Sequence, residues 1–226
     1  IISEYWNSYG TSFVDPAYIK ATPHDKCEVR NPALVDSVFM QKNIYLIKDM
    51  WLETFPDQID QFGNTLIKAG AEFNIGDCNV CRYELMPFDT TLTLKDLKFN
   101  DKCKISSDSS LLTAFRDSTV LEYKHIVYGP YITLPAGHYN ACFYAKCEAG
   151  ESDKAIAVLD IVAGYGQNVL GSLKLTPREM KKSEAGAPLE IPFTTIRPVE
   201  NVEFRIYYYG NSDLEFSHIE ISNPKD

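Results

Sequence analysis

Six residues in the C-terminal half of the sequence have the types and spacing of a ligand-binding surface: Tyr131, Asn140, Tyr144, Asp160, Arg205 and Tyr207. They alternate with apolar residues, so an extended chain would direct them away from the core into which their neighbours pack. Tyrosine rings offer flat apolar surfaces with a polar tip, and Asp, Asn and Arg side chains offer hydrogen bonds. This combination suits the apolar faces and the hydroxyl groups of a sugar, and it predicts a shallow carbohydrate site without catalytic groups.

Asp160 and Arg205 also have a structural interpretation. Asp160 lies in the middle of an otherwise apolar run, 155–163, next to Leu159. A carboxylate in such a run needs a partner, and Arg205 could form an ion pair with it under the expected helices, with tyrosines packed around the pair. The sequence leaves the binding interpretation and this structural interpretation open.

The other motifs in the sequence give weaker indications of a binding or catalytic site. The pair Cys78-Asn-Val-Cys81 has the spacing of half a zinc site or of a redox pair, but no second such motif follows, so plain thiols are favoured. The sequence contains no HExxH, GxSxG or phosphate-binding GxxxxGK[ST] motif. We therefore expect no cofactor, apart from the possibility of a structural calcium ion at the loop residues Asp108, Asp117 and Asp153.

The elements that must position these residues are short strands. Alternating segments separated by turns such as Gly164-Tyr-Gly166 and Gly210-Asn211 predict a mainly β fold, an antiparallel jelly-roll-like sandwich over residues 72–226. The expected strands are 80–86, 91–97, 121–128, 131–134, 138–146, 155–163, 169–175, 189–193, 202–209 and 214–221. Residues 176–187 are expected to form a loop or a short helix.

Residues 1–71 are expected to form an N-terminal extension with two helices. Asn31-Pro32 is a good helix start, and apolar residues follow at helical spacing to about residue 55. A second helix is expected to begin at Pro56-Asp57 and to end at Gly70.

Composition narrows the classes of partner. The net charge is −9, the pI is about 5.0, and no run of Lys and Arg occurs, so nucleic acid and anionic membranes are excluded as expected partners. No apolar run approaches the roughly 20 residues needed for a membrane span. The six irregularly spaced cysteines favour free thiols in a reducing compartment, which predicts a cytoplasmic location. Because the chain begins with Ile1 rather than Met, we expect a fragment of a longer protein.

The order of motifs from Tyr128 to Ile221 is similar to that of a known group of modules. Tyr128-Gly-Pro-Tyr131 precedes Leu134-Pro-Ala-Gly137-His-Tyr139, and Val158-Leu-Asp-Ile-Val162 and Val202-Glu-Phe-Arg205 follow. This order resembles β-sandwich accessory modules attached to bacterial glycosyltransferases and methyltransferases of surface polysaccharide biosynthesis. The resemblance covers roughly the last 100 residues, and it implies a glycan-binding accessory module without naming a sugar.

Three functions remain open from the sequence. The first is a non-catalytic carbohydrate-binding module that acts with a fused or associated glycosyltransferase. The second is a structural or assembly protein of a surface or phage, in which the sandwich makes protein contacts and the chain is a possible homo-oligomer. The third is an enzyme, which is the least favoured because the sequence offers no clustered acid–base pair.

Overall fold

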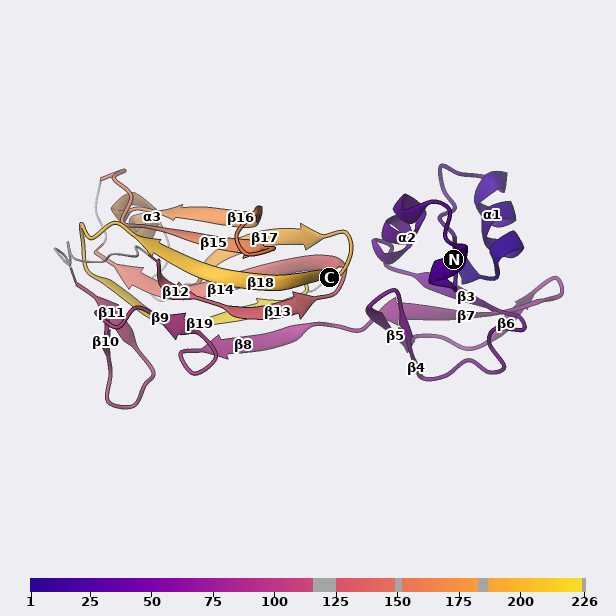
Figure 1. Ribbon diagram of the computed structural model, residues 1–226, viewed down its shortest axis with the longest axis horizontal. Helices are drawn as coiled ribbons and strands as arrows, with labels where there is room; N and C mark the ends of the chain where they lie inside the picture. The colour runs from indigo at the N-terminus through magenta and orange to yellow at the C-terminus, as the bar shows by residue number, and fades with distance from the viewer. Residues whose placement is uncertain (116–124, 149–151, 183–186, 225–226) are drawn as a thin grey trace. The chain divides into compact units, whose positions relative to one another are not determined.

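The structure is a computed structural model that describes residues 1–115, 125–148, 152–182 and 187–224 (Figure 1). The chain forms two compact units. The first consists of Ile1–Pro87 with the short segments Pro135–Gly137 and Thr195–Pro198. The second consists of Phe88–Leu134, His138–Thr194 and the chain from Val199 onward.

The first unit is a mixed sheet covered by helices. In the described residues, its strands are arranged in the order β2-β1-β3-β7-β5-β4, with β6 paired to β7. Its elements are β1 (Ile2–Ser3), α1 (Tyr5–Val14), β2 (Thr22–Pro23), a 3₁₀ turn (Lys26–Glu28), α2 (Pro32–Phe39), β3 (Ile44–Lys48), β4 (Gln58–Gln61), β5 (Asn64–Lys68), β6 (Phe73–Ile75) and β7 (Cys78–Leu85). No helix in the described residues is long and apolar enough to cross a membrane.

The start of α2 is as predicted, because the Asn31 side chain accepts a hydrogen bond from the Ala33 backbone and Pro32 occupies the first helical position. The prediction of helices beyond Phe39, where α2 ends, is wrong. β3, β4 and β5 occupy that region, and Phe62 and Gly63 both have positive φ, as a two-residue hairpin turn between β4 and β5 requires. The expected domain boundary after residue 71 falls between β5 and β6 of this sheet.

The physical reason for the error is that a short apolar run fits both the helical period of 3.6 residues and the strand period of two. The run Ile44-Tyr-Leu-Ile47 is rich in β-branched and aromatic residues, which favour strands, although its apolar residues also fall on a helical stripe. Residues Ile44 and Leu46 are fully buried, and they form a core with Val38, Phe39 and Tyr83. Packing of this sheet against α2 therefore decides the conformation.

The second unit is an antiparallel sandwich of two sheets, as predicted. The β14 sheet contains β10 (Lys104–Ile105), β11 (Leu112–Ala114), β19 (Leu214–Ser222), β14 (Gly137–Cys147) and β17 (Leu189–Thr195), with β8 (Asp89–Thr93) paired to β19. The β18 sheet contains β16 (Asn168–Leu175), β15 (Ala157–Ala163), β18 (Val199–Tyr208), β12 (His125–Tyr128) and β9 (Lys98–Phe99), with β13 (Pro130–Leu134) paired to β18. A short helix, α3 (Pro177–Lys182), follows β16.

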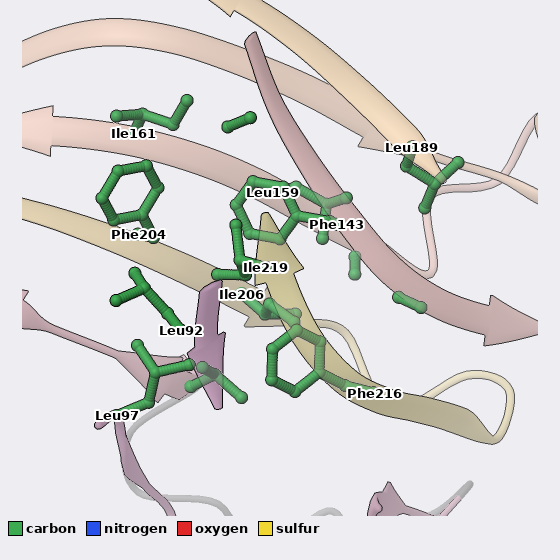
Figure 2. Close-up of a cluster of buried hydrophobic side chains, with 14 of the residues drawn as sticks. Leu92, Leu97, Phe143, Leu159, Ile161, Leu189, Phe204, Ile206, Phe216 and Ile219 are labelled. Carbon is green, nitrogen blue, oxygen red and sulfur yellow. The ribbon is translucent and has the colours of Figure 1, made fainter. Parts of the chain in front are cut away.

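The core of this unit lies between the inward faces of the two sheets. Phe143 from β14 and Leu159, Phe204 and Ile206 from the β18 sheet are fully buried within one continuous cluster (Figure 2). Aromatic contacts join the layers, since Phe193 of β17 stacks on Tyr139 and meets the edge of Phe204. At one side, a Cβ on Gly171 of β16 would lie 2.8 Å from a methyl group of Ile191 on β17, so the two sheets approach there too closely for a side chain.

Each strand predicted from period-two alternation overlaps a described strand, and the mainly β class is confirmed. The strands β6, β9, β10 and β11 were not predicted, because each has only two or three residues, too few to show alternation. The expected strand 121–128 is described from residue 125 onward, and residues 121–124 lie outside the described part of the chain. The helical alternative for 176–187 is realised by α3 in its described part. Alternation succeeds best for β14 and β17, in which every second residue is buried and the residues between are more exposed.

Replacing Phe204 with Ala should destabilise the chain by about 3–5 kcal/mol, because it removes a fully buried ring and leaves a cavity between the sheets. The matched control is Val169→Ala on β16, where the side chain is exposed and the expected change is within about 0.5 kcal/mol. Urea denaturation followed by circular dichroism measures both. Equal effects of the two substitutions would contradict the assignment of Phe204 to the core.

Candidate functional site

The pairing of β15 with β18 determines which side chains leave the sandwich. Leu159 lies opposite Ile206 on the inward face, and Asp160 lies opposite Arg205 on the outward face. Tyr207 is two residues further along β18 and shares the outward face with Arg205. The outward face of the β18 sheet therefore carries Asp160, Arg205 and Tyr207 together.

Asp160 and Arg205 form a bidentate ion pair. The Nε and Nη2 groups of Arg205 donate hydrogen bonds to the two carboxylate oxygens of Asp160, at 2.9 and 2.7 Å. The Arg205 and Asp160 side chains are only 18% and 14% exposed. The hydrogen bond to Asp160 is the main cause that raises the pKa of Arg205, so the guanidinium stays charged. The structural alternative inferred from the sequence is thus realised within the predicted site.

A tight turn between β15 and β16 lies against this pair. Gly164, Tyr165 and Gly166 all have positive φ, and a Cβ at Gly166 would come within 2.9 Å of Nη1 of Arg205. Glycine is needed at 166 both for the backbone conformation and for this close approach. The turn therefore restricts the guanidinium on the side not occupied by Asp160.

Tyr131 lies on the same sheet in an unusual backbone conformation. Its φ is +70°, which is a strained value for a bulky residue. Its side chain lies close to the Glu203 carboxylate, and the Lys98 ammonium lies 5.1 Å from the centre of its ring. Burial, together with the nearby Glu203 carboxylate, raises the pKa of Tyr131, so the phenol stays protonated at neutral pH.

A cavity of about 510 Å³ opens on this face. Arg205 is the only residue of the predicted set that lines it, and Asp160, Tyr131 and Tyr207 contact its lining residues Arg205, Glu203 and His125. The cavity is lined by Phe99, Asn100, Asp101, His125, Tyr128, Glu203 and Arg205. The lining combines aromatic rings with hydrogen-bonding groups, which is the composition expected of a ligand pocket.

His125 forms one wall of the cavity. Its ring contacts the edge of Tyr207, with centroids 5.2 Å apart. Burial and the positive charge of Arg205 lower the pKa of His125, which makes the imidazole neutral at pH 7. A neutral imidazole both donates and accepts a hydrogen bond, so it can bind a hydroxyl group in either sense.

Asn140 and Tyr144 do not join this site. Both lie on β14, on the outward face of the other sheet, with the hydrophobic core between them and Arg205. The Tyr144 ring stacks on His218 at 4.1 Å and its hydroxyl donates to Glu220, while Asn140 donates to Glu190. The six predicted residues therefore divide between two opposite faces, because alternation identifies the outward side of a strand but not the sheet to which the strand belongs.

Sequence reasoning missed most of the cavity wall. Phe99 ends β9, and Asn100 and Asp101 follow it. His125 and Tyr128 come from β12, which pairs with both β9 and β18. The sequence did contain a signal for one of the missed residues. Glu203 lies two positions before Arg205, so it shares the outward face of β18. The remaining residues reach the site through pairing of distant strands.

The metal hypotheses gain no geometric support in the described residues. Cys78 and Cys81 stand three positions apart on β7, so one is exposed and the other is buried. The Asp108 carboxylate accepts hydrogen bonds from Ser106 and Ser110, which lower its pKa to about 2, and Asp153 pairs with Arg178. Asp117 lies outside the described residues. Within the described part of the chain, no group of three His, Cys, Asp or Glu residues could hold a metal ion.

Comparisons with known proteins give only distant similarities. No protein-family model and no curated protein matches the chain. Among solved structures, the C-terminal CBM6 of LamC, a marine laminarinase from Zobellia galactanivorans, is 13% identical and has a TM-score of 0.41, with 60% of this chain and 100% of that chain covered. The carbohydrate binding module CBM6cm-2 from Cellvibrio mixtus lichenase 5A, in complex with cellotriose, is 10% identical and has a TM-score of 0.36, with 60% and 98% covered.

A third similar structure contains the CBM22-1–GH10 modules of Clostridium thermocellum xylanase 10B complexed with xylohexaose. It is 14% identical and has a TM-score of 0.32, and 61% of this chain and 26% of that chain are covered. Because all three TM-scores are below 0.5, we derive no ligand and no site residue from these similarities.

The contact between Gly166 and Arg205 is testable with two glycine substitutions. Gly210→Ala is the matched control, because Gly210 also has a positive φ but has open space around it, so we expect only a backbone strain of about 1–2 kcal/mol. Gly166→Ala should cost about 1–3 kcal/mol more, because its methyl group would meet the guanidinium. Thermal unfolding measures the difference, and the NMR signal of the Arg205 Nε–H group reports whether the pair with Asp160 is displaced. An unchanged Arg205 signal in Gly166→Ala would contradict this arrangement.

Proposed function

We propose that this protein is a non-catalytic carbohydrate-binding module, and that it binds a glycan on the outward face of the β18 sheet. The observation that carries the proposal is the cavity beside Arg205, whose wall places the rings of Phe99 and Tyr128 next to the polar groups of Asn100 and His125. Flat rings can pack on the C–H faces of a sugar, and the polar groups can bind its hydroxyls.

The size and rigidity of the site support this assignment. A cavity of about 510 Å³ lies within the range of roughly 300–1,000 Å³ that is typical of small-ligand sites. The ion pair between Asp160 and Arg205 and the close turn at Gly166 hold one wall in place before any ligand arrives. A preformed wall reduces the conformational entropy lost on binding.

Binding is favoured over catalysis by the state of the carboxylates. Hydrolysis of a glycosidic bond uses two carboxyl groups, one of which must act as a general acid. Here both carboxylate oxygens of Asp160 accept hydrogen bonds from Arg205, and Glu203 is buried next to Tyr131. Carboxylates that are held by neighbouring side chains in this way suit a binding wall better than a proton-transfer step.

The resemblance in motif order supports a role beside a bacterial surface-polysaccharide biosynthesis enzyme. In this proposal, a fused or associated glycosyltransferase elongates a chain that the module holds nearby. Linking a weak module to an enzyme raises the local concentration of the glycan, so weak binding would be sufficient. We place this role in the cytoplasm, where the six cysteines, all free thiols in the structure, would remain reduced.

The test is calorimetric titration of the chain with bacterial surface polysaccharides and with neutral oligosaccharides. Phe99→Ala and Tyr128→Ala should each weaken binding at least about tenfold, because each removes a ring from the cavity wall. Tyr144→Ala is the matched control on the opposite sheet and should leave the affinity unchanged. Circular dichroism establishes that the variants fold.

The control also separates the two faces. If Tyr144→Ala abolishes binding while Phe99→Ala and Tyr128→Ala bind normally, the glycan site lies on the β14 sheet and the present assignment is wrong. If the folded chain binds no glycan at all, the carbohydrate function itself is refuted.

A structural or assembly role is the second candidate, because α1 buries polar residues and exposes large apolar ones, the reverse of the usual arrangement. Ser8 and Ser12 of this helix are buried and hydrogen-bond to the backbone of Thr22 and Ala21. Trp6 and Phe13, in contrast, are 81% and 87% exposed. Large apolar side chains gathered on an exposed face are typical of protein-contact surfaces.

This second candidate predicts self-association through α1. Sedimentation of the chain should then show a dimer or larger oligomer, and Trp6→Asp combined with Phe13→Asp should convert it to a monomer, since a charge at either position would be buried without a partner. Lys20→Asp serves as a control for the change in charge. A monomer at all concentrations would remove homo-oligomerisation from consideration.

A further inference from the structure

The charges around the cavity bear on which glycans it can accept. Its lining contains two carboxylates, Asp101 and Glu203, and one permanent cation, Arg205. The Arg205 charge is matched by Asp160, directly opposite on β15. The wall that a ligand meets is therefore net negative, in a chain whose overall charge is −9.

The guanidinium of Arg205 is largely occupied. Its Nε and Nη2 groups donate to Asp160, and Nη1 lies where a Cβ of Gly166 would be 2.9 Å away. Arginine binds anionic ligands best through two parallel N–H groups, and the edge formed by Nε and Nη2 is already used in this way. A ligand carboxylate would have to compete with Asp160 for that edge.

The neighbouring basic groups do not replace it. Lys98 lies over the Tyr131 ring and is not among the residues that line the cavity. Burial and the nearby positive charge of Arg205 lower the pKa of His125, so its imidazole is neutral at pH 7. Among the lining residues, the carboxylates of Asp101 and Glu203 thus act on an incoming anion without a free cation beside them.

We propose that this cavity selects neutral glycans and rejects acidic ones, those whose sugars carry carboxylate, sulfate or phosphate groups. This inference rests on the proposed carbohydrate function and names the ligand class of the same site. The physical basis is repulsion between ligand anions and the wall carboxylates in a partly enclosed space, where water screens charges less than at an open surface. A neutral sugar meets the same carboxylates as hydrogen-bond acceptors for its hydroxyls.

The test uses pairs of probes that differ only in charge. Each pair is a neutral hexasaccharide and the same chain oxidised to the uronate at C6, prepared for β-1,4-, β-1,3- and α-1,4-linked glucans. Titration calorimetry at low salt measures both members against the full chain. We expect at least one neutral hexasaccharide to bind, and its uronate partner to bind at least about tenfold more weakly.

Three variants test the cause. Asp160→Asn frees the guanidinium without changing the shape of the side chain, and it should raise the ratio of uronate to neutral affinity by about tenfold. Asp101→Asn, at an exposed position, should raise the same ratio with little effect on folding. Glu220→Gln, which removes a charge from the opposite sheet, is the control and should leave the ratio unchanged.

The outcomes separate this inference from the function beneath it. A uronate that binds as well as its neutral partner, or better, overturns the charge selectivity and leaves the carbohydrate function standing. A selectivity that does not change in Asp101→Asn and Asp160→Asn overturns the proposed cause. Absence of binding by both members of every pair overturns the selection of neutral glucans, and it overturns the carbohydrate function as well if the polysaccharides of the first test also fail to bind.

Discussion

The register between β15 and β18 is the constraint on which the sandwich and its outer face both depend. It sets Leu159 against Ile206 inside the core and Asp160 against Arg205 outside it. Since side chains alternate along a strand, a slip of β15 by one residue against β18 would move Asp160 to the core face and Leu159 to the solvent face, and it would leave Arg205 without its partner. The packing of the core therefore also specifies the ion pair, and the ion pair in turn disfavours any other register.

The ion pair contributes more to specificity than to stability. Removing a carboxylate and a guanidinium from water costs free energy that their attraction only partly offsets, and pairs of this kind are often no more stabilising than apolar residues of similar size. Its main effect is on geometry, because the two parallel hydrogen bonds fix the orientation of the guanidinium and so fix the shape of the adjacent cavity wall. Tyr131, which has a positive φ and lies close to Glu203, adds a second residue with a fixed backbone conformation to the same face.

Much of the sandwich could be predicted from sequence because its strands obey a simple rule. Strands such as β14 and β17 bury every second residue, so a period of two survives in the residue order. In the first unit the prediction failed at Phe62-Gly63. This hairpin turn has an aromatic residue with positive φ at a position where Asn or Asp is the usual signal. Alternation also correctly placed Asn140 and Tyr144 on an outward face, but strand pairing across distant parts of the chain decides which face, and the cavity residues Asn100 and His125 depend on the same long-range pairing.

The close approach of Gly171 to Ile191 has a consequence for how the sandwich could have changed in evolution. β16 and β17 are edge strands of opposite sheets, and at Gly171 they meet with no room for even a methyl group. The two sheets are thus in close contact along this edge, and a larger residue at position 171 would push β16 and β17 apart. Growth of the domain by insertion or by an added strand is therefore easier at the opposite flank, where β9 and β10 end their sheets.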